Sequence, residues 1–487
     1  MGDVTPSSAS TLQLLERYDR PGPRYTSYPT AVEFHNGVRN DIYVEHLARM
    51  NRAGDEPISA YVHLPFCEHR CSFCGCNVVI TPHREVASRY LDAVEQEIDL
   101  LASHLPNRRT IAQLHWGGGT PTYYTPEQLS RVFARIARHF TFTADAELGV
   151  EIDPRVTTIA HLDMLRSLGF NRLSMGVQDF DPTVQEAINR IQSYEMTRDL
   201  LVHARDHGFG SINIDLIYGL PHQTPATFAK TLEQVLTLRP DRVAAYSFAF
   251  VPWMSAHMKK IDIDALPPAE TKLALLAATV DAFTGAGYQQ IGMDHFALPT
   301  DELARAIDTR TLNRNFMGYT VKTTTDMVAM GVSAIGNVQG AFVQNTKKLS
   351  EYYEAVEAGQ FPIERGYELD RDDEIRRYVI TELMCNFRLD IANVERRFGI
   401  DFADYFAGEM AKLTAPEDSP VADGLVTITS ARPDAAPSYK DALPEAAPSY
   451  IEIQPVGRMF VRNICMLFDK YLAKRTGGPK PVFSRTV

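Results

Sequence analysis

The chain has 487 residues, of which 45% are apolar and 23% are charged, the composition of a globular protein large enough for two or three domains. Its formal net charge of -12 argues against general affinity for nucleic acid or anionic membranes, because both require a basic surface. We therefore expect no nucleic-acid or membrane partner, and any anionic substrate must be met by local arginines or lysines.

The N-terminal residues MGDVTPSSAS lack the basic start and apolar stretch of a secretory signal. The most apolar run, LALLAATV at 273–280, is far shorter than the roughly 20 residues that cross a bilayer. Six cysteines in a chain of this length do not suggest a disulfide framework. We expect a cytoplasmic protein whose clustered cysteines bind a metal or take part in catalysis.

Short apolar, β-branched runs alternate with longer helical patterns from residue 57 onwards. Two of the helical patterns begin with Thr-Pro, at 125–126 and 224–225, a pair typical of a helix start. Such a series predicts an α/β fold with a parallel sheet, closed or partly closed into a barrel, and an active site at the C-terminal strand ends. The six predicted strands are 59–66, 110–116, 147–153, 172–178, 211–218 and 243–250.

After about residue 365 the pattern changes to several helices, two short strands at 424–429 and 450–457, and a last helix from Arg458. This order predicts a small, mostly helical C-terminal domain of winged-helix type. Between the two strands, DAAPSY recurs as EAAPSY in a stretch rich in Pro, Ala and Ser, which predicts a flexible hairpin insert at about 430–449. We divide the chain into an N-terminal extension that covers the active site, a barrel domain and the C-terminal domain, at residues 1–56, 57–365 and 366–487.

Residues 67–77, CEHRCSFCGCN, directly follow the first predicted strand and contain four of the six cysteines. The spacing of Cys67, Cys71 and Cys74 lets three thiolates converge on one iron–sulfur cluster. A cluster with three protein ligands keeps one iron open to another molecule. The alternatives are a structural zinc site, or an electron-transfer cluster in which Cys76 is a fourth ligand.

The aromatic residue in CSFC and the motifs at later strand ends favour the open cluster. Here the chain resembles the radical S-adenosylmethionine (SAM) enzymes. It is similar along nearly its whole length to the oxygen-independent coproporphyrinogen III oxidase family, and the hairpin insert is the clearest departure. The resemblance implies a partial (β/α)6 radical SAM barrel and a [4Fe-4S] cluster held by Cys67, Cys71 and Cys74, with SAM at the open iron. The matching segments include RYDRPGPRYTSYPT, YVHLPFCEHRCSFCGCN, HWGGGTPT, EIDPR, NRLSMGVQDF, INRIQ, NIDLIYGLP, YQQIGMDHFA and NRNFMGYT.

The resemblance also implies which residues bind SAM. A run of glycines lets the backbone approach a ligand, although a glycine run alone more often marks a turn. Carboxylates inside apolar strands are costly to bury without a partner, and a shared polar ligand explains several of them better than separate salt bridges to helices. The family has been interpreted as holding two SAM molecules, in which case these residues divide between two sites. By resemblance the cofactor-binding residues are Tyr61, Phe73, Gly118, Gly119, Thr120, Glu151, Gln178, Arg190, Asp215, Ala249 and Ile335, with Phe73 against the adenine.

The activity that the resemblance implies is the oxygen-independent decarboxylation of two propionates of coproporphyrinogen III to vinyl groups, giving protoporphyrinogen IX. This step of haem biosynthesis proceeds through a 5′-deoxyadenosyl radical formed from SAM. Cys76 and Tyr61 are the candidate catalytic residues. The implied partners are coproporphyrinogen III and an electron donor such as a flavodoxin or ferredoxin, and we expect a monomer.

A substrate with four carboxylates requires local cations. Arg24 and Arg314 are the candidates, because Arg pairs bidentately with carboxylates, and the alternative for each is a structural arginine. Asp294 and His295, in GMDHF, are candidates for proton handling, although a lone His beside a strand is more often a structural hydrogen bonder.

Two other functions are compatible with part of this pattern. A haem chaperone of the same superfamily would share the barrel and three cysteines without decarboxylating anything. Relatives of that kind lack the GCN continuation with its extra cysteine and the long PRYTSYPT segment, and this chain has both. An electron carrier would need no SAM-binding loop and no polar strand ends, so both alternatives are less favoured.

Overall fold

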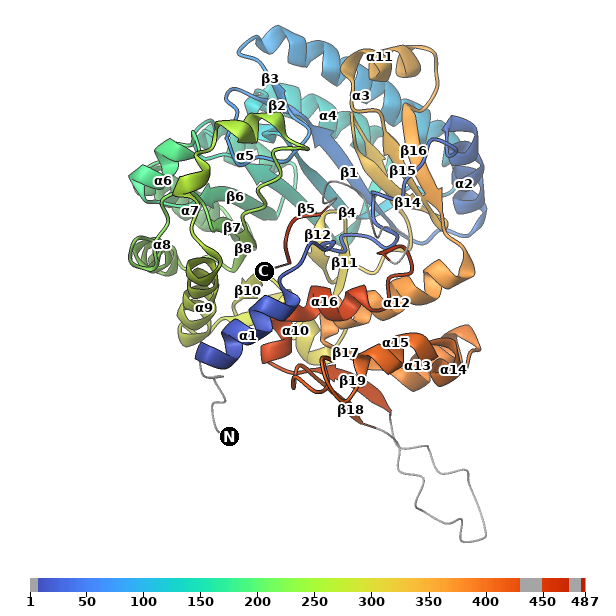
Figure 1. The fold of residues 1–487 in the computed structure, drawn as a ribbon. Helices are drawn as coiled ribbons and strands as arrows, with labels where there is room; N and C mark the ends of the chain where they lie inside the picture. The colour runs from blue at the N-terminus through green and yellow to red at the C-terminus, as the bar shows by residue number, and fades with distance from the viewer. Residues whose placement is uncertain (1–7, 430–448, 473–482, 487) are drawn as a thin grey trace.

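The computed structural model describes residues 8–429, 449–472 and 483–486. Its centre is a twelve-stranded sheet, in which six neighbouring parallel strands run in the order β1-β4-β5-β6-β7-β8 (Figure 1). All six strands predicted from the sequence are present, with ends displaced by a few residues. They are β1 (Ile58–Leu64), β4 (Thr110–Gly118), β5 (Thr141–Ile152), β6 (Arg172–Gln178), β7 (Ser211–Tyr218) and β8 (Arg242–Ser247).

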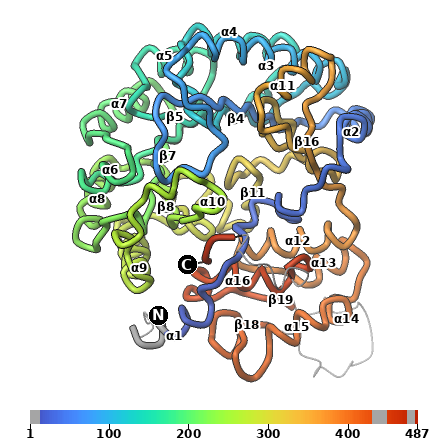
Figure 2. The backbone as a smooth tube through the Cα atoms, turned by 45° about the horizontal axis from the view of Figure 1, so that its top comes forward, coloured from blue at the N-terminus to red at the C-terminus, as the bar shows by residue number. Residues whose placement is uncertain are grey.

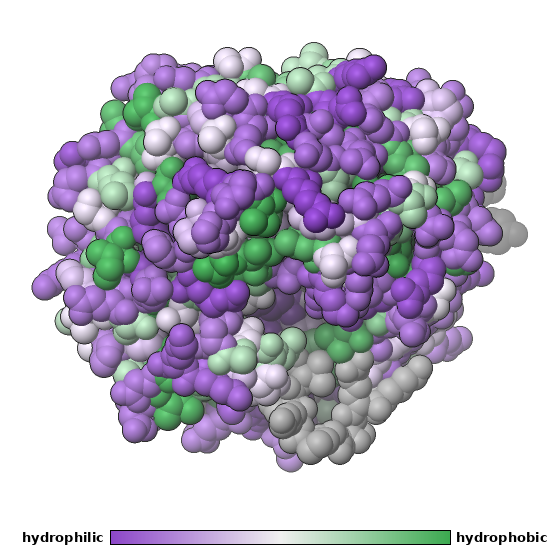
Figure 3. Space-filling model, turned by 90° about the horizontal axis from the view of Figure 1, so that it is seen from above, coloured by the Kyte–Doolittle hydropathy of each residue, from purple (hydrophilic) through white to green (hydrophobic). Residues whose placement is uncertain are grey.

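The helices between these strands cover the outer face of the sheet (Figures 1 and 2). Both Thr-Pro pairs begin helices as predicted, because the side chains of Thr125 and Thr224 accept hydrogen bonds from the backbone three residues on. Seen from above, the surface is mostly hydrophilic, with apolar side chains gathered near its centre (Figure 3). The covering helices are α3 (Arg84–His104), α4 (Pro126–His139), α5 (Ile159–Ser167), α6 (Pro182–Ala187), α7 (Tyr194–Asp206) and α8 (Pro225–Leu238).

The sheet extends beyond the six expected strands on both sides. Beside β1 lies the parallel strand β13 (Met327–Met330), followed by three antiparallel strands, and beside β8 lie two more antiparallel strands. The two edge strands, β16 and β9, are not paired with each other, so the barrel is partial, as predicted. The added antiparallel strands are β14 (Ile335–Val338), β15 (Ala341–Asn345), β16 (Ile363–Glu368), β10 (His295–Ala297) and β9 (Gln289–Ile291).

Smaller elements surround the open end and the edges of the barrel. The parallel pair β2 (Phe66–Cys67) and β3 (Val79–Ile80) brackets the cysteine loop. The antiparallel pair β11 (Asn313–Asn315) and β12 (Gly318–Thr320) lies beside the cavity described below. The remaining elements before residue 366 are α1 (Ser8–Tyr18), α2 (Asn40–Arg52), η1 (Pro121–Tyr123), η2 (Ala256–Lys260), η3 (Ile263–Ala265), α9 (Ala269–Gly285), α10 (Glu302–Thr309) and α11 (Leu349–Glu357).

The C-terminal part is mostly helical with a small antiparallel sheet in the order β17-β19-β18. The two predicted strands are present as β18 and β19, whereas β17 was not predicted and the last helix is shorter than expected. The predicted hairpin insert falls almost entirely on residues 430–448, outside the described residues. The elements are α12 (Arg371–Asn386), β17 (Arg388–Asp390), α13 (Ile391–Phe398), α14 (Phe402–Tyr405), α15 (Ala407–Leu413), β18 (Val426–Thr429), β19 (Tyr450–Ile453), η4 (Val456–Phe460) and α16 (Val461–Met466).

The N-terminal segment joins the barrel to the C-terminal part. The side chains of Tyr18, Tyr25 and Tyr28 belong to the hydrophobic core of the C-terminal helices, whereas α2 packs against β14 and β15. The Arg462 guanidinium, on α16, donates hydrogen bonds to backbone carbonyls of both chain ends, among them those of Pro23 and Thr486 at 2.9 and 3.2 Å. In the described part of the chain no helix is both long enough and apolar enough to span a bilayer.

Candidate active site

The cysteine loop lies at the carboxyl end of β1, as predicted. Cys67, Cys71 and Cys74 line one cavity of about 400 Å³. The Cys67 thiol lies 3.3 Å from the Thr120 hydroxyl, and burial raises the pKa of Cys67 to about 12. A protein with nothing bound therefore keeps this thiol protonated, whereas a bound metal favours the thiolate.

Two arginines, the buried Arg190 and the half-buried Arg155, offset the charge that thiolates would bring. Arg155 and Arg190 donate to the Cys71 sulfur at 3.5 and 3.6 Å, and both guanidiniums also contact the Asp153 carboxylate, at 2.6 and 3.0 Å. Burial alone would raise the pKa of Asp153, but the two arginines lower it below the usual value. The site thus holds a fixed carboxylate and two cations beside the thiols, a donor set that fits an anionic cluster.

Cys76 lies beside Cys74 and lines the same cavity, with its side chain exposed. A hydrogen bond with Cys76 is the main reason that the pKa of Cys74 is lowered to about 7. The backbone of the loop is held from outside by the His257 ring, whose Nε2 lies 2.8 Å from the carbonyl oxygen of Cys74. The structure therefore brings all four thiols of the loop to one cavity.

The glycine loop at the end of β4 forms one wall of the cavity. Gly118 has a φ of +113°, which only glycine adopts without strain, and its N–H donates to the Glu151 carboxylate at 3.0 Å. A Cβ on Gly117 would lie 2.7 Å from that carboxylate, and a Cβ on Gly119 would lie 2.5 Å from the Pro65 carbonyl group. The glycines are thus required by close packing against β1 and β5.

Two carboxylates, on the strands that flank β6, face this cavity with opposite pKa shifts. Burial and then Glu151 raise the pKa of Asp215 to about 6, although Asn213 and Ser174 donate to its carboxylate at 2.8 and 3.1 Å. Burial alone would also raise the pKa of Glu151, but His115 and the Gly118 N–H outweigh it and lower the value. Glu151 is therefore ionised at neutral pH, and Asp215 is poised to take a cationic or hydroxyl-bearing partner.

Gln178 and Arg190 are two further polar residues in the lining of this cavity. Gln178 ends β6 with a φ of +71°, a left-handed conformation that is unusual for a side chain of this size. The Arg190 guanidinium donates to the carbonyl oxygen of Gly176, and its buried Nε has no hydrogen-bond partner among the described residues. An unpartnered buried donor beside a cavity is the kind of group that a bound ligand satisfies.

Most of the residues predicted to bind the cluster or SAM or to act in catalysis line this cavity, but three of them do not. Tyr61 stacks on His115, with ring centroids 6.1 Å apart, and its hydroxyl lies 3.0 Å from His63 Nδ1. Ala249 follows β8 and Ile335 begins β14, and neither lines this cavity or its neighbour. The predicted residues that do line it are Cys67, Cys71, Phe73, Cys74, Cys76, Gly118, Gly119, Thr120, Glu151, Gln178, Arg190 and Asp215.

A second cavity of about 150 Å³ continues into the barrel and shares Glu151, Ser174, Asp215 and Tyr246 with the first. Charged pairs lie around its deeper part, such as Arg242 with Asp301 and Glu302 at 2.9 and 3.0 Å. The two cavities together form a polar path from the cysteine loop into the barrel.

The two candidate substrate arginines lie together beside this path. Arg314 donates from Nη1 to the carbonyl oxygen of Arg24 at 2.9 Å, and Arg24 lies 3.7 Å from the Asp294 carboxylate. Burial alone would raise the pKa of Asp294, but His295, Arg314 and Arg24 lower it to about 2. The buried Arg314 Nε has no hydrogen-bond partner among the described residues, and the Tyr246 and His295 rings are 5.8 Å apart.

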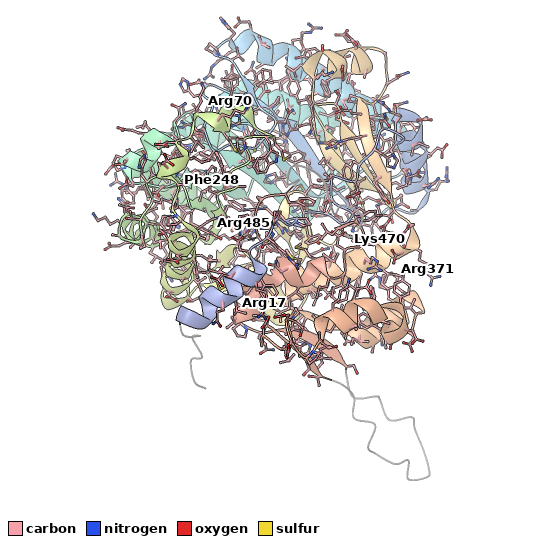
Figure 4. All side chains as sticks on the ribbon, in the orientation of Figure 1. Arg17, Arg70, Phe248, Arg371, Lys470 and Arg485 are labelled. Atoms are coloured by element: carbon pink, nitrogen blue, oxygen red, sulfur yellow. The ribbon has the colours of Figure 1, made fainter. Side chains whose placement is uncertain are left out.

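Sequence reasoning missed several supporting groups. Asp153 and Arg155 stand in the motif EIDPR but were given no role, and their position directly after a predicted strand was the available signal. His63 and His115 alternate with apolar residues inside β1 and β4, a pattern that fits an ordinary half-buried strand equally well. Arg70, on the cysteine loop, is visible near the top of the barrel in Figure 4.

Comparisons with known proteins agree with this geometry. The chain matches the Radical SAM superfamily over residues 61–235 and the HemN C-terminal domain over residues 369–432. It is 47% identical to the oxygen-independent coproporphyrinogen III oxidase of Salmonella typhimurium, over 95% of this chain and 96% of that protein. The Pseudomonas aeruginosa protein of the same name is 43% identical, over 94% and 95%. The solved structure of coproporphyrinogen III oxidase (HemN) from Escherichia coli, a radical SAM enzyme, superposes with a TM-score of 0.85, at 45% identity over 94% of this chain and 98% of that one.

Three convergent thiols beside a polar cavity at the open end of a partial parallel barrel define a radical SAM enzyme, which uses a [4Fe-4S] cluster and SAM. Within that class, identity at this level over nearly the whole length decides the family. The chain belongs to the oxygen-independent coproporphyrinogen III oxidase family.

Proposed function

We propose that this protein catalyses the oxygen-independent oxidative decarboxylation of two propionate side chains of coproporphyrinogen III, giving the vinyl groups of protoporphyrinogen IX. Each propionate loses CO2, one hydrogen atom and one electron. The observation that carries the proposal is the set of three cysteines facing a polar cavity, in a chain of this family. The relatives named above are oxidases, which favours this activity over that of a haem chaperone.

The residues present fit both cofactors. Cys67, Cys71 and Cys74 would hold the cluster, and Arg155 and Arg190 would balance its negative charge. The cluster and SAM, when bound, supply the carbon radical that removes a hydrogen atom from the substrate. The protein contributes binding, orientation and exclusion of water.

The strand ends would bind the polar parts of SAM. The ionised Glu151 carboxylate and the Asp215 carboxylate suit hydroxyl or ammonium groups, and the unpartnered Arg190 Nε suits a carboxylate. The glycine loop would let the ligand approach the backbone of residues 118–120. Phe73 would lie against the adenine, because it lines the cavity and packs with the apolar cluster around Ile188.

Arg24 and Arg314 would meet the carboxylates of the substrate. Two guanidiniums in one place suit a tetracarboxylate, and the buried Arg314 Nε still lacks a partner among the described residues. Asp294 and His295, 2.7 Å apart, hold this cationic group in place, so we assign them positioning roles. Tyr61 and Cys76 keep their predicted catalytic roles as part of this proposal.

We also propose that an external one-electron carrier such as a flavodoxin or ferredoxin reduces the cluster, and that the enzyme acts as a cytoplasmic monomer. All six cysteines are free, which suits a compartment that keeps thiols reduced. The division at residues 56 and 365 remains our proposal for the domain organisation. The described part of the stretch 1–56 would then cover the barrel mouth, where Arg24 donates to the carbonyl oxygen of Ser247 at 2.9 Å.

The test is an anaerobic assay of the reconstituted protein with SAM, dithionite and coproporphyrinogen III. We expect CO2, 5′-deoxyadenosine and protoporphyrinogen IX in step with one another. Stable haem binding without any decarboxylation would reject the oxidase proposal and support the chaperone. Omission of SAM from otherwise complete reactions is the control.

A further inference from the structure

A cluster of two histidines and one aspartate lies on the outer layer of the barrel. Asp163 is on α5, His203 is on the last turn of α7, and His207 follows directly after that helix. The two helices contact each other and lie side by side in Figures 1 and 2, away from the C-terminal part. The function proposed above gives these residues no role.

The side-chain geometry brings three ligand atoms together. His203 Nε2 lies 2.6 Å from the Asp163 carboxylate, and the His203 and His207 rings stack with centroids 3.8 Å apart. One ligand atom from each of the three residues lies within 4.8 Å of the others. In a tetrahedral zinc site, metal–nitrogen distances of about 2.1 Å separate neighbouring ligand atoms by about 3.4 Å, so small side-chain rotations close the site.

The hydrogen bonds of His207 favour ligation. Its Nδ1 lies 2.8 Å from the backbone carbonyl oxygen of His203, so Nδ1 carries the proton and Nε2 keeps its lone pair. A histidine that donates one ring N–H to a carbonyl and offers the other nitrogen is the usual arrangement of a metal ligand. The Arg166 Nε donates to the carbonyl oxygen of His207 at 3.2 Å and so fixes the two helices relative to each other without a metal.

A second cluster of possible metal ligands is present among the described residues, but it already has a cation. Asp370, Asp372 and Asp373 already surround a cation, because the Lys470 ammonium lies 2.9 to 3.0 Å from each carboxylate. In the cluster on α5 and α7 the ligand atoms converge with the Asp163 and His207 side chains exposed, so an ion can reach them directly from solvent.

We propose that Asp163, His203 and His207 bind one divalent transition-metal ion of the zinc class, with water as a fourth ligand. Two imidazoles and one carboxylate suit Zn2+, Ni2+ or Cu2+ and not the oxygen-binding Mg2+ or Ca2+. The ion would join α5 to α7, the helices that precede and follow β6 in the chain. The site is separate from the cysteine loop, so it stands independently of the proposed oxidase activity.

The test is calorimetric titration of the cluster-loaded enzyme with ZnCl2, because a loaded cluster keeps its three cysteines from binding zinc. We expect one zinc per chain, a rise of a few degrees in the melting temperature, and at least about a tenfold loss of affinity in His207→Ala. MgCl2 at the same concentration should leave the melting temperature unchanged.

The matched control is His139→Ala. His139 Nε2 lies 2.7 Å from the Asp99 carboxylate, so this variant removes a half-buried histidine–aspartate pair that has no second histidine. It should bind zinc like the unaltered protein. Absence of zinc binding at 100-fold excess would overturn the proposal. Zinc affinity that persists unchanged in both His207→Ala and Asp163→Asn would overturn it as well, and would place the ion elsewhere, for example at Cys76.

Discussion

Replacing Gly119 by alanine tests whether the glycine loop is shaped by close packing. The new Cβ would lie 2.5 Å from the carbonyl carbon and oxygen of Pro65, whereas ordinary contacts begin at 3.4 Å. The neighbour is backbone, so the loop must move by about 0.9 Å, the difference between these distances. Strain of this kind costs about 1–3 kcal/mol. If this strain destabilises the SAM-bound protein and not the free protein, SAM affinity drops by about 5- to 150-fold.

The movement would also reach the cluster. Thr120, next along the chain, donates its N–H to the carbonyl oxygen of Phe66 at 3.0 Å, and its hydroxyl lies 3.3 Å from the Cys67 sulfur. We would measure SAM binding by calorimetry and the cluster by its visible absorption. Gly75→Ala is the matched control, because a Cβ there meets nothing within 4 Å. An unchanged SAM affinity together with an unchanged melting temperature in Gly119→Ala would refute the packing argument.

Three further predictions concern the thiols, the buried carboxylate and the core. Cys76→Ala should keep the four-iron absorption spectrum after reconstitution, whereas alanine at any of the other three cysteines of the loop should abolish it; loss in Cys76→Ala would make all four thiols ligands. Because burial raises the pKa of Asp215 to about 6, SAM affinity should increase as pH rises from 5 to 7, and a flat calorimetric profile would contradict its role. The same raised pKa means that, without ligand, the contribution of Asp215 to stability declines as pH rises through 6, since the buried group must then ionise. Arg108→Ala should lower the free energy of unfolding by about 3–5 kcal/mol, because it leaves the buried Asp326 carboxylate without its cation at 3.3 Å. Urea denaturation measures this free energy, and Arg109→Ala, at the half-buried neighbouring residue, should change it little. Equal effects of the two substitutions would show that the ion pair is not the cause.

The central strands were predictable because each has a residue pattern that indicates a strand by itself. β8 has an apolar centre, and β7 alternates apolar residues with Ser211, Asn213 and Asp215, the period of a strand with one polar face. The strands β13 and β14 were missed because each has only four residues, too few for a period to show, and Gly331 separates them. Their order in the sheet depends on long-range pairing that no local pattern encodes.

The site residues likewise divide into those that a local sequence pattern groups together and those that meet only through the fold. The cysteine spacing and the glycine run are local in sequence, so their grouping follows from the order of the residues alone. The link between Arg190 and Cys71 spans 119 residues, and its strength depends on burial, which the sequence does not display. Tyr61 illustrates the reverse case: it is on the predicted strand, yet its ring stacks on His115 and does not line the cavity of the cysteine loop.

The contacts of Arg462 imply an order of events during synthesis. This side chain ties Pro23 to the tail that contains Thr486, and Arg485, visible between the barrel and α1 in Figure 4, pairs with Asp19. The segment around Pro23 therefore leaves the ribosome first yet lacks its final partners until residue 486 has followed. The contacts between the N-terminal segment and the C-terminal tail can therefore form only after all six parallel strands, from β1 to β8, have been synthesised.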